Sequence, residues 1–511
     1  MLNIHRFISL CLVVLLIACS PKPKKPNIII ILADDLGWSD LGCYGSEIST
    51  PNLDHLANNG MRFTQFYNTA KCFPSRACLL TGVYAQDCGY DRTYRNPITN
   101  ALTFGEVLRD AGYQTYWSGK HHGLENPIYR GFDRYYGLKD GACNHFNPGH
   151  QRDGEAPPAQ KKGDRAWCID SSMYRPYTPT EKNFYTTDYF THYGLAFLEE
   201  AAQQQKPFLL YLAYTAPHDP LMAWQEDIDK YSGAYDEGYE AIRQKRFQKQ
   251  QALELIDTTY QLPTAMHQTW DSLSLAERDF EVAKMEVYAA MIDRLDQNIG
   301  RVLKKLEALN LDKNTLILFL SDNGASAEVV DLKNDDDGAK VGVLERWVSL
   351  GADWANVSNT PFNYYKNYSF EGGINTPFIA YWKDKIKPNS FSDFTGHFID
   401  VMPTFMELSG ATYSENDTLT PPRGQSLVPV FLGKSQERTD ALFWEWSKGK
   451  AVRKGDWKIV KRELEQEWEL YNLKTDPTER ENLYTQYPEI VQQLDSLYLL
   501  WENSHSTKEM P

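Results

Sequence analysis

Three short runs made almost entirely of apolar residues constrain the fold of this chain more than any other feature of its sequence. They are residues 27–33 (NIIIILA), 207–213 (PFLLYLA) and 315–320 (TLILFL). Runs of this kind are typical of strands that are buried on both faces, as in parallel sheets. Because helix-prone stretches separate them, the sequence predicts an α/β domain with a mostly parallel sheet.

The remaining elements follow from amphipathic periods, caps and turns. We expect a helix that begins after the cap at residues 50–54 and ends near residue 59. Further helices are expected at residues 102–111, 184–205 and 280–308, and a further strand at 113–118. Residues 225–278 are polar and helix-prone, and we interpret them as an insertion. After about residue 440 the pattern changes to short strands at 441–446, 450–452, 457–461 and 468–471, followed by a helix at 488–502. This change indicates a small C-terminal α+β subdomain.

The charge balance excludes one class of partner. Lys and Arg number 53 against 68 Asp and Glu, which gives a formal net charge of −15. Nucleic-acid binding needs a basic surface, so this acidity argues against it. An anionic small substrate is still compatible, because a few local cations can outweigh the global field at close range.

The N-terminus has the pattern of an export signal. His5 and Arg6 precede an apolar run at residues 7–18, which is too short to span a bilayer. The run ends in Leu16-Ile17-Ala18-Cys19, which resembles the lipobox of bacterial lipoproteins. The resemblance implies a signal peptide (1–18), lipidation of Cys19 and a tether (19–26). The chain would then be exported and lipid-anchored at the bacterial envelope, on the periplasmic face or the cell surface. The alternative is an ordinary signal peptide with an incidental cysteine.

Six cysteines remain in the body of the chain, and their spacing matches neither a disulfide framework nor a zinc cluster. Export permits disulfides. Cys143 and Cys168 flank a loop rich in Gly and Pro, and we expect them to be the pair if one forms.

Carboxylates follow two of the buried strands. Asp34 and Asp35 come after the first run, and Asp322 and Asn323 follow the third. Ligand sites in open α/β sheets lie outside the carboxyl ends of the strands. An all-oxygen set of this kind suits a hard cation such as Ca²⁺ or Mg²⁺. Taken singly, each motif could equally be a turn or a helix cap.

Residues 72–82 (CFPSRACLLTG) carry the most specific motif. Pro74 suits a first helical position and Gly82 a helix end, so Cys72 lies near a helix N-terminus, where anions are favoured, and Arg76 lies one turn on. Taken alone, Cys72 could be a buried cysteine at a helix start. Cys-x-Pro-Ser-Arg followed by Leu-Thr-Gly resembles the signature of type I sulfatases, whose cysteine is oxidised to Cα-formylglycine.

Further motifs extend the resemblance over residues 27–484, in the order found in that family. Those with polar side chains are Asp34-Asp35, Gly119-Lys120-His121-His122, Pro217-His218, Ser321-Asp322-Asn323-Gly324, and Lys366 with Glu371-Gly372-Gly373. Several separated motifs in one order make coincidence improbable.

The resemblance implies an alkaline-phosphatase-like fold, with a mixed sheet between helices, and one metal ion, usually Ca²⁺, with Mg²⁺ as the alternative. Asp34, Asp35, Asp322 and Asn323 would bind the metal, with the modified Cys72 above it. The catalytic domain would span 27–420 and the C-terminal α+β subdomain 421–511. A separate formylglycine-generating enzyme would have to modify Cys72.

The same resemblance assigns roles in hydrolysis. A hydroxyl of the aldehyde hydrate would attack sulfur, while the cation, Arg76, Lys120 and Lys366 neutralise the sulfuryl oxygens. His218, with Lys366 beside it, would protonate the leaving oxygen. His122 would then take a proton from the remaining hydroxyl, which releases sulfate by elimination and restores the aldehyde.

The substrate expected from the resemblance is a sulfate monoester, either an aryl sulfate or a sulfated saccharide, in the arylsulfatase-like branch of exported bacterial lipoproteins. Candidates for lining a sugar pocket are His145, Asn147, His150, Trp354, Tyr364 and Tyr365. Two alternatives stay open: a formylglycine-dependent hydrolase of phosphonate monoesters or phosphodiesters, and a catalytically silent glycan-binding lipoprotein. A two-zinc phosphatase is disfavoured because no histidine accompanies either carboxylate motif in the sequence.

Overall fold

The computed structural model describes residues 24–333, 338–414 and 416–506. The predicted signal peptide and Cys19, the predicted lipidation site, lie outside these residues. Within them, the main sheet has ten strands in the spatial order β13 (Ser390–Ser392), β2 (Met61–Phe63), β12 (Phe378–Trp382), β9 (Thr315–Ser321), β1 (Asn27–Asp34), β8 (Phe208–Pro217), β4 (Gln114–Gly119), β5 (Arg134–Leu138), β6 (Trp167–Ile169) and β7 (Ser172–Tyr174).

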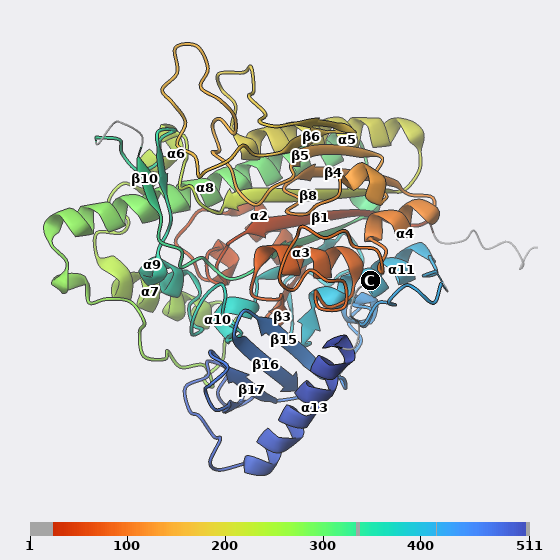
Figure 1. Cartoon of the computed structure of the whole chain (residues 1–511), viewed down its shortest axis with the longest axis vertical. Helices are drawn as coiled ribbons and strands as arrows, with labels where there is room; N and C mark the ends of the chain where they lie inside the picture. The colour runs from red at the N-terminus through yellow and green to blue at the C-terminus, as the bar shows by residue number, and fades with distance from the viewer. Residues whose placement is uncertain (1–23, 334–337, 415, 507–511) are drawn as a thin grey trace, which may run out of the picture.

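The centre of the sheet is parallel, as predicted, and its margins are antiparallel. Strands β9, β1, β8, β4 and β5 run parallel to their neighbours in that series. Strand β12 pairs antiparallel with β9, and β6 pairs antiparallel with β5. In Figure 1 the labels β6, β5, β4, β8 and β1 follow one another down the picture. The predicted α/β class is therefore confirmed.

The isoleucine run of β1 shows why these strands are apolar throughout. Ile28, Ile30 and Leu32 belong to the hydrophobic cluster on one face of the sheet, whereas Ile29 and Ile31 belong to the cluster on the other. Successive side chains of a strand point to opposite faces, so a strand covered on both sides needs an apolar residue at every position.

Helices cover both faces of the sheet. The α-helices of seven or more residues among the described residues are α2 (Pro51–Asn58), α3 (Cys72–Thr81), α4 (Phe104–Asp110), α5 (Thr186–Gln204), α7 (Gly238–Ala252), α8 (Leu275–Ala308), α9 (Ala352–Ser358), α11 (Val401–Ser409) and α13 (Pro488–Ser506). Three one-turn helices are α6 (Gln225–Ile228), α10 (Glu371–Ile374) and α12 (Val428–Phe431). None of the helices in the described residues is long and apolar enough to cross a bilayer.

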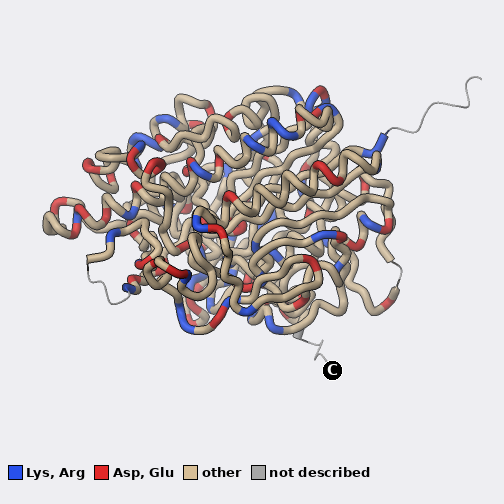
Figure 2. Tube along the Cα trace, turned by 90° about the horizontal axis from the view of Figure 1, so that it is seen from above, with Lys and Arg blue, Asp and Glu red and all other residues tan. Residues whose placement is uncertain are grey.

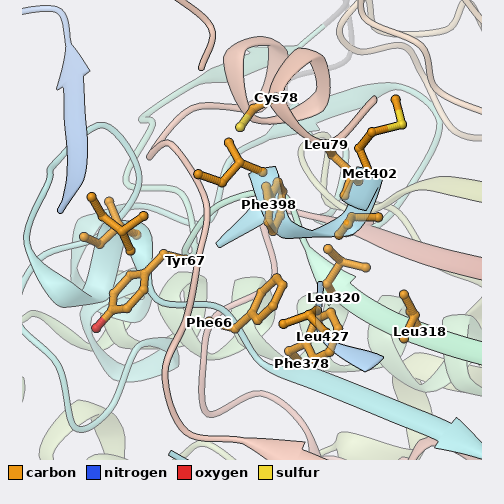
Figure 3. Packing of buried hydrophobic residues seen from close by; sticks show 14 of the residues in the cluster. Phe66, Tyr67, Cys78, Leu79, Leu318, Leu320, Phe378, Phe398, Met402 and Leu427 are labelled. Atoms are coloured by element: carbon orange, nitrogen blue, oxygen red, sulfur yellow. The ribbon is translucent and has the colours of Figure 1, made fainter. Parts of the chain in front are cut away.

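Helix α3, which carries the Cys72 motif, packs on the face that also receives α4 and α11. Figure 3 shows Cys78 and Leu79 of α3 near Phe398 and Met402, above Leu320 of β9. All ten residues of α3 are buried. The helix is therefore held rigidly against the sheet, with its N-terminus in the interior.

Helix α8 begins five residues earlier than predicted. Ser274 and Glu277 form a capping box, in which the Ser274 hydroxyl accepts the Glu277 N–H and the Glu277 carboxylate accepts the Ser274 N–H. A Ser-x-x-Glu pattern is a recognised helix start. The predicted start of this helix near residue 280 was wrong, although the Ser274–Glu277 pattern is visible in the sequence.

The segment interpreted as an insertion is part of the packed domain. Arg246 of α7 is fully buried and forms ion pairs with Asp40 at 2.6 Å and Glu47 at 2.8 Å. Gln250, one turn further along α7, donates to the carbonyl of Thr360 at 2.8 Å. Buried polar residues of this segment therefore tie α7 to the loop after β1.

The predicted pairing of Cys143 with Cys168 is wrong. Both are free and buried thiols. Cys143 belongs to the hydrophobic cluster on one face of the main sheet and Cys168 to the cluster on the other face, so the sheet separates them.

The C-terminal residues form the predicted four-stranded sheet with a helix. Strands β15 (Leu442–Trp446), β16 (Gly449–Lys454), β17 (Trp457–Lys461) and β18 (Glu469–Asn472) pair antiparallel in sequence order. Figure 1 shows this sheet and α13 in blue at the lower end of the molecule. Their apolar residues join the same cluster as α3 and α11. The domain boundary at residue 420 stays a prediction.

Candidate active site

Four neighbouring parallel strands deliver polar residues to one edge of the main sheet. Asp322 follows β9, Asp34 ends β1, His218 follows β8 and Lys120 follows β4. The register aligns these ends, because Ala33 pairs with Ser321 and Asp34 with Pro217. The carboxyl edge of a parallel sheet is where α/β proteins bind ligands.

Asp34 lies at the centre of a buried charge cluster. Its Oδ2 is 2.5 Å from Nζ of Lys120 and 3.5 Å from Nη2 of Arg76. Burial alone would raise the pKa of Asp34, but the charges of Lys120, His218 and Arg76 outweigh burial and hold the pKa well below its ordinary value. Asp34 is therefore an anion inside the protein.

Arg76 connects the carboxylates that follow β1 and β9. Its Nε donates to Oδ2 of Asp322 at 2.8 Å, and its Nη1 donates to the carbonyl of Lys120 at 3.1 Å. The guanidinium is 1% exposed, so it depends on these partners. Burial and the repulsion of Asp34 raise the pKa of Asp322 despite Arg76.

Asp35 adopts a left-handed backbone conformation (φ 63°), which turns its carboxylate into the same cluster. Its Oδ2 lies 2.9 Å from Nζ of Lys366 and 3.5 Å from Nε2 of His218. Its Oδ1 accepts a hydrogen bond from Nδ2 of Asn323 at 2.7 Å. Lys366 thus joins the site from the loop that precedes α10, about 330 residues away in sequence.

Cys72 is the first residue of α3 and is 2% exposed. Arg76 lies one turn further along, and the Cys72 sulfur is close enough to influence the pKa of both Arg76 and Lys366. A group at the N-terminus of a helix faces free backbone N–H groups, which favour negative charge. The helix and the two cations therefore create an anion-binding environment at Cys72.

The two predicted catalytic histidines differ in protonation. Burial by itself would lower the pKa of His218, but Asp35, Asp34 and Asp219 outweigh burial and raise the pKa to about 9. For His122, burial together with the positive charges of Lys120 and Arg76 lowers the pKa well below its ordinary value. One histidine is thus a proton donor and the other a proton acceptor near neutral pH.

The structure brings His218 beside the carboxylates, as the family resemblance implied and the strand-end motifs alone did not indicate. Asp34, Asp35 and His218 each have a ligand atom within 4.8 Å of the others. Two buried oxygens nearby, Oδ1 of Asp34 and Oδ1 of Asn323, lack a hydrogen-bond partner among the described residues. Buried oxygens without donors are costly unless a cation or water binds them. All ten predicted catalytic and metal-binding residues lie in or beside this cluster.

Sequence reasoning missed the charged residues around His218 and Lys366. Asp219 lies 2.7 Å from Nδ1 of His218, and Glu328 lies 3.4 Å from Nζ of Lys366. Lys161 lies 3.6 Å from Asp219. Asp219 could have been found from its position directly after His218. Glu328 and Lys161 have no local signal, because only the fold brings them here.

Several candidates for a sugar pocket are instead interior residues. Asn147 and Trp354 are fully buried, and Trp354 donates to the carbonyl of Glu281 at 2.9 Å. His145 is 1% exposed and its Nε2 lies 3.1 Å from the carbonyl oxygen of His218, so it supports the His218 loop. Among the six candidates, His150 is exposed and Tyr364 and Tyr365 are partly buried.

Family models match most of the chain. A model described as sulfatase matches residues 26–411, and one described as N-sulphoglucosamine sulphohydrolase, C-terminal, matches residues 362–501. Together they span the main domain and the C-terminal sheet.

Relatives in sequence and structure agree with these models. The chain is 34% identical to an uncharacterized sulfatase of Schizosaccharomyces pombe over 94% of each chain, and 33% identical to an arylsulfatase of Klebsiella aerogenes over 83% of this chain and 96% of that one. The crystal structure of Ps i-CgsB superposes with a TM-score of 0.68 at 25% identity, covering 94% of this chain and 93% of that one. The expected alkaline-phosphatase-like arrangement, a large mixed sheet flanked by helices, is confirmed. The chain belongs to the sulfatase family and is an arylsulfatase-like sulfuric ester hydrolase.

Proposed function

We propose that the chain hydrolyses sulfate monoesters with a formylglycine made from Cys72 and a bound divalent cation, which we take to be Ca²⁺. The observation that carries the proposal is the position of Cys72, buried at the start of α3 beside the Asp34–Asp35 cluster and within electrostatic reach of Arg76 and Lys366. Oxidation of this residue to an aldehyde would give a hydrate whose hydroxyl can attack sulfur.

The residues at the edge of the sheet fit a hard cation. Asp34, Asp35, Asp322 and Asn323 offer oxygen atoms, and two of these oxygens are buried without a donor. Ca²⁺ accepts six to eight oxygen ligands in flexible geometry, whereas Mg²⁺ requires a stricter octahedron. A bound cation supplies positive charge that favours ionisation of the attacking hydroxyl and neutralises sulfuryl oxygens.

The chain's own residues hold charge and move protons. Arg76, Lys120 and Lys366 present buried positive charge to the sulfuryl oxygens. His218 carries a proton that it donates to the leaving ester oxygen as the sulfur–oxygen bond breaks, and Asp219 at 2.7 Å orients its ring. His122, neutral at working pH, accepts a proton from Cys72 in its modified form, so that sulfate departs by elimination.

We propose sulfated saccharides as the natural substrates, with aryl sulfates as small probes of the same site. The support comes from relatives: Ps i-CgsB was solved in complex with k-i-k-neocarrahexaose, and curated relatives include arylsulfatases and N-acetylgalactosamine-6-sulfatases. We also propose export and lipid anchoring through Cys19, which fatty-acid labelling of the wild type and of Cys19→Ser would test.

The first experiment is the mass of the tryptic peptide from Cys72 to Arg76, from protein made in a host with a formylglycine-generating enzyme. Lys71 and Arg76 provide the two cleavage sites. A mass lower by the thiol-to-aldehyde difference, together with release of inorganic sulfate from a sulfate monoester, supports the proposal. An unmodified cysteine in fully active protein contradicts it.

A matched pair of variants separates the nucleophile from general damage. Cys72→Ala is expected to abolish sulfate release, whereas Cys88→Ala, at another buried free cysteine, retains it. Sulfate release by Cys72→Ala would disprove the nucleophile. Competing a sulfate monoester against a phosphonate monoester and a phosphodiester tests the alternative substrate class.

A further inference from the structure

We propose that a basic pocket beside the catalytic centre binds a second anionic group, sulfate or carboxylate, of the saccharide whose sulfate is cleaved at Cys72. The inference rests on the proposed function, because it names a further binding site for the same substrate. Four cations line this pocket, and we call them the basic cluster. They are Arg95, Lys139, Arg165 and Arg175.

The pocket is a defined cavity of about 350 Å³. It is lined by Tyr94, Gly123 and Leu124, by the basic cluster, and by Asp140, Gly163 and Asp164. Four cations thus face two carboxylates in one cavity. The volume suits a sulfate or carboxylate group with the sugar ring that carries it.

Most of the positive charge in this pocket is unpaired. Arg175 lies 3.9 Å from Asp140 and donates to the carbonyl of Asp164 at 3.2 Å. Arg95, Lys139 and Arg165 have no carboxylate within 4.0 Å in the part of the chain that the structure describes. Asp140, in turn, accepts the backbone N–H of Ala166 at 2.6 Å.

The excess of positive charge in this pocket contrasts with the charge of the whole chain. The net charge is −15, and Figure 2 shows acidic and basic residues interspersed along the chain. Most of the other arginines near the sheet form ion pairs, as Arg130 does with Glu106 and Glu125 at 3.1 and 2.6 Å. A cavity with excess positive charge in an acidic protein focuses its field on an anionic ligand.

The pocket adjoins the catalytic centre through one aromatic ring. Tyr94 lines the pocket and its ring centroid is 4.7 Å from that of His122. Phe73, the neighbour of Cys72, lies 5.7 Å from both rings. Gly123, which follows His122, also lines the pocket. An extended ligand can therefore reach both sites across Tyr94.

The arrangement predicts which ligands gain affinity. A saccharide with anionic groups on neighbouring positions can place one at Cys72 and another in the basic cluster. An aryl monosulfate or a free sulfate ion occupies only one of the two sites. Charge-assisted hydrogen bonds to the guanidinium and ammonium groups would then strengthen binding of the longer ligand alone.

The test compares the inhibition of 4-nitrophenyl sulfate hydrolysis by sucrose octasulfate and by inorganic sulfate, using full-length protein with verified formylglycine. The variant is Lys139→Gln/Arg165→Gln. We expect the inhibition constant of sucrose octasulfate to rise at least about tenfold relative to that of inorganic sulfate, because two charge-assisted contacts are lost. If the ratio of the inhibition constant of sucrose octasulfate to that of inorganic sulfate is the same in the variant as in wild type, the proposal is overturned.

Lys304→Gln/Lys387→Gln is the control, because it removes the same charge from two exposed lysines outside the pocket. An equal change in this control would show a general charge effect and would also overturn the proposal.

Oligogalacturonate as inhibitor shows whether carboxylates are accepted as well as sulfates. If modified protein fails to hydrolyse any sulfate ester, the proposed function fails. The pocket is then tested by calorimetric binding of sucrose octasulfate to Cys72→Ala with and without the double substitution.

Discussion

Lys458 of the C-terminal sheet forms a buried ion pair with Glu371 at the start of α10, with 2.8 Å between Nζ and Oε1. The same Nζ lies 2.7 Å from Glu479, whose other oxygen accepts the backbone N–H of Glu371 at 2.7 Å. Glu371 follows Lys366, for which we propose a catalytic role, by five residues. The C-terminal sheet therefore fixes the segment that places Lys366 against Asp35.

Replacing Lys458 should damage both stability and catalysis. In Lys458→Met the carboxylates of Glu371 and Glu479 are buried without their cation, which should cost about 3–5 kcal/mol of unfolding free energy. The kcat for 4-nitrophenyl sulfate should fall, because the segment carrying Lys366 loses its anchor. Urea unfolding and initial rates measure the two effects.

Glu479→Gln provides the comparison for this site. Burial and the nearby Glu371 raise the pKa of Glu479 despite Lys458, so the loss of its charge should cost less than the loss of Lys458. An unfolding midpoint lower in Glu479→Gln than in Lys458→Met would contradict the assignment of Lys458 as the central charge.

Removal of divalent cations should destabilise the protein as well as inactivate it. Asp34 and Asp35 are adjacent carboxylates in the interior, and a bound cation relieves their repulsion. At a free Ca²⁺ concentration of about one hundred times Kd, binding adds about 2.7 kcal/mol to stability. EDTA should therefore lower Tm, and Ca²⁺ should restore it.

Asn323→Ala removes one of the oxygens that lack a donor, so the Ca²⁺-dependent rise in Tm should shrink in this variant. A wild-type Tm that does not respond to EDTA or Ca²⁺ would exclude a cation at this cluster.

Acid should destabilise the fold through buried neutral histidines. Burial lowers the pKa of His145 to about 4, whereas an unfolded histidine titrates near 6.5. Between these values the unfolded chain binds more protons than the folded one, so this residue's contribution is intact above about pH 6.5 and stability falls as pH decreases, by up to about 1.4 kcal/mol per pH unit.

Urea midpoints at about pH 8 and pH 5 would measure this dependence. In His145→Gln the difference between the two midpoints should be smaller than in wild type. His192→Gln, at an exposed position of α5, should keep the wild-type difference. Equal acid sensitivity of wild type and His145→Gln would assign the effect to other groups.

Gly119 should not tolerate a side chain. It has φ +128°, and a Cβ there would lie 1.9 Å from the carbonyl oxygen of Ala213 on β8. Gly119→Ala should lose at least about 2 kcal/mol of stability and lower kcat, because Lys120 follows directly. Gly112→Ala is the control for positive φ alone, since its Cβ would meet nothing within 4 Å. Similar losses in the two variants would show that backbone strain, not the close approach of the strands, dominates.

The sequence predicted the centre of the sheet and the site residues because both depend on local patterns. Continuous apolar runs mark strands covered on both faces, and the carboxyl ends of such strands meet at one edge. The motif around Cys72 predicted the start of helix α3 and the position of Arg76 on it. The strand ends thus identified Asp34 and Asp322, and the family resemblance added His218.

What the sequence could not predict depends on which face of the sheet a residue occupies. Cys143 and Cys168 are close in sequence and separated by the sheet. Trp354 was a candidate for lining a sugar pocket and is packed in the core. The apolar run of strand β12 was overlooked, and no local signal indicated that it pairs antiparallel with β9 across a long connection. The unpaired cations beside His122 likewise come from loops that only the fold brings together.

The burial of Cys72 sets an order of events for the proposed maturation. Its side chain is 2% exposed at the start of a fully buried helix, and the groups around it come from segments as far apart as Asp34 and Lys366. A modifying enzyme can reach this thiol only in a chain that has not yet completed its fold. If Cys72 is matured as we propose, folding and oxidation compete in time, and a molecule that folds first retains its thiol and stays inactive.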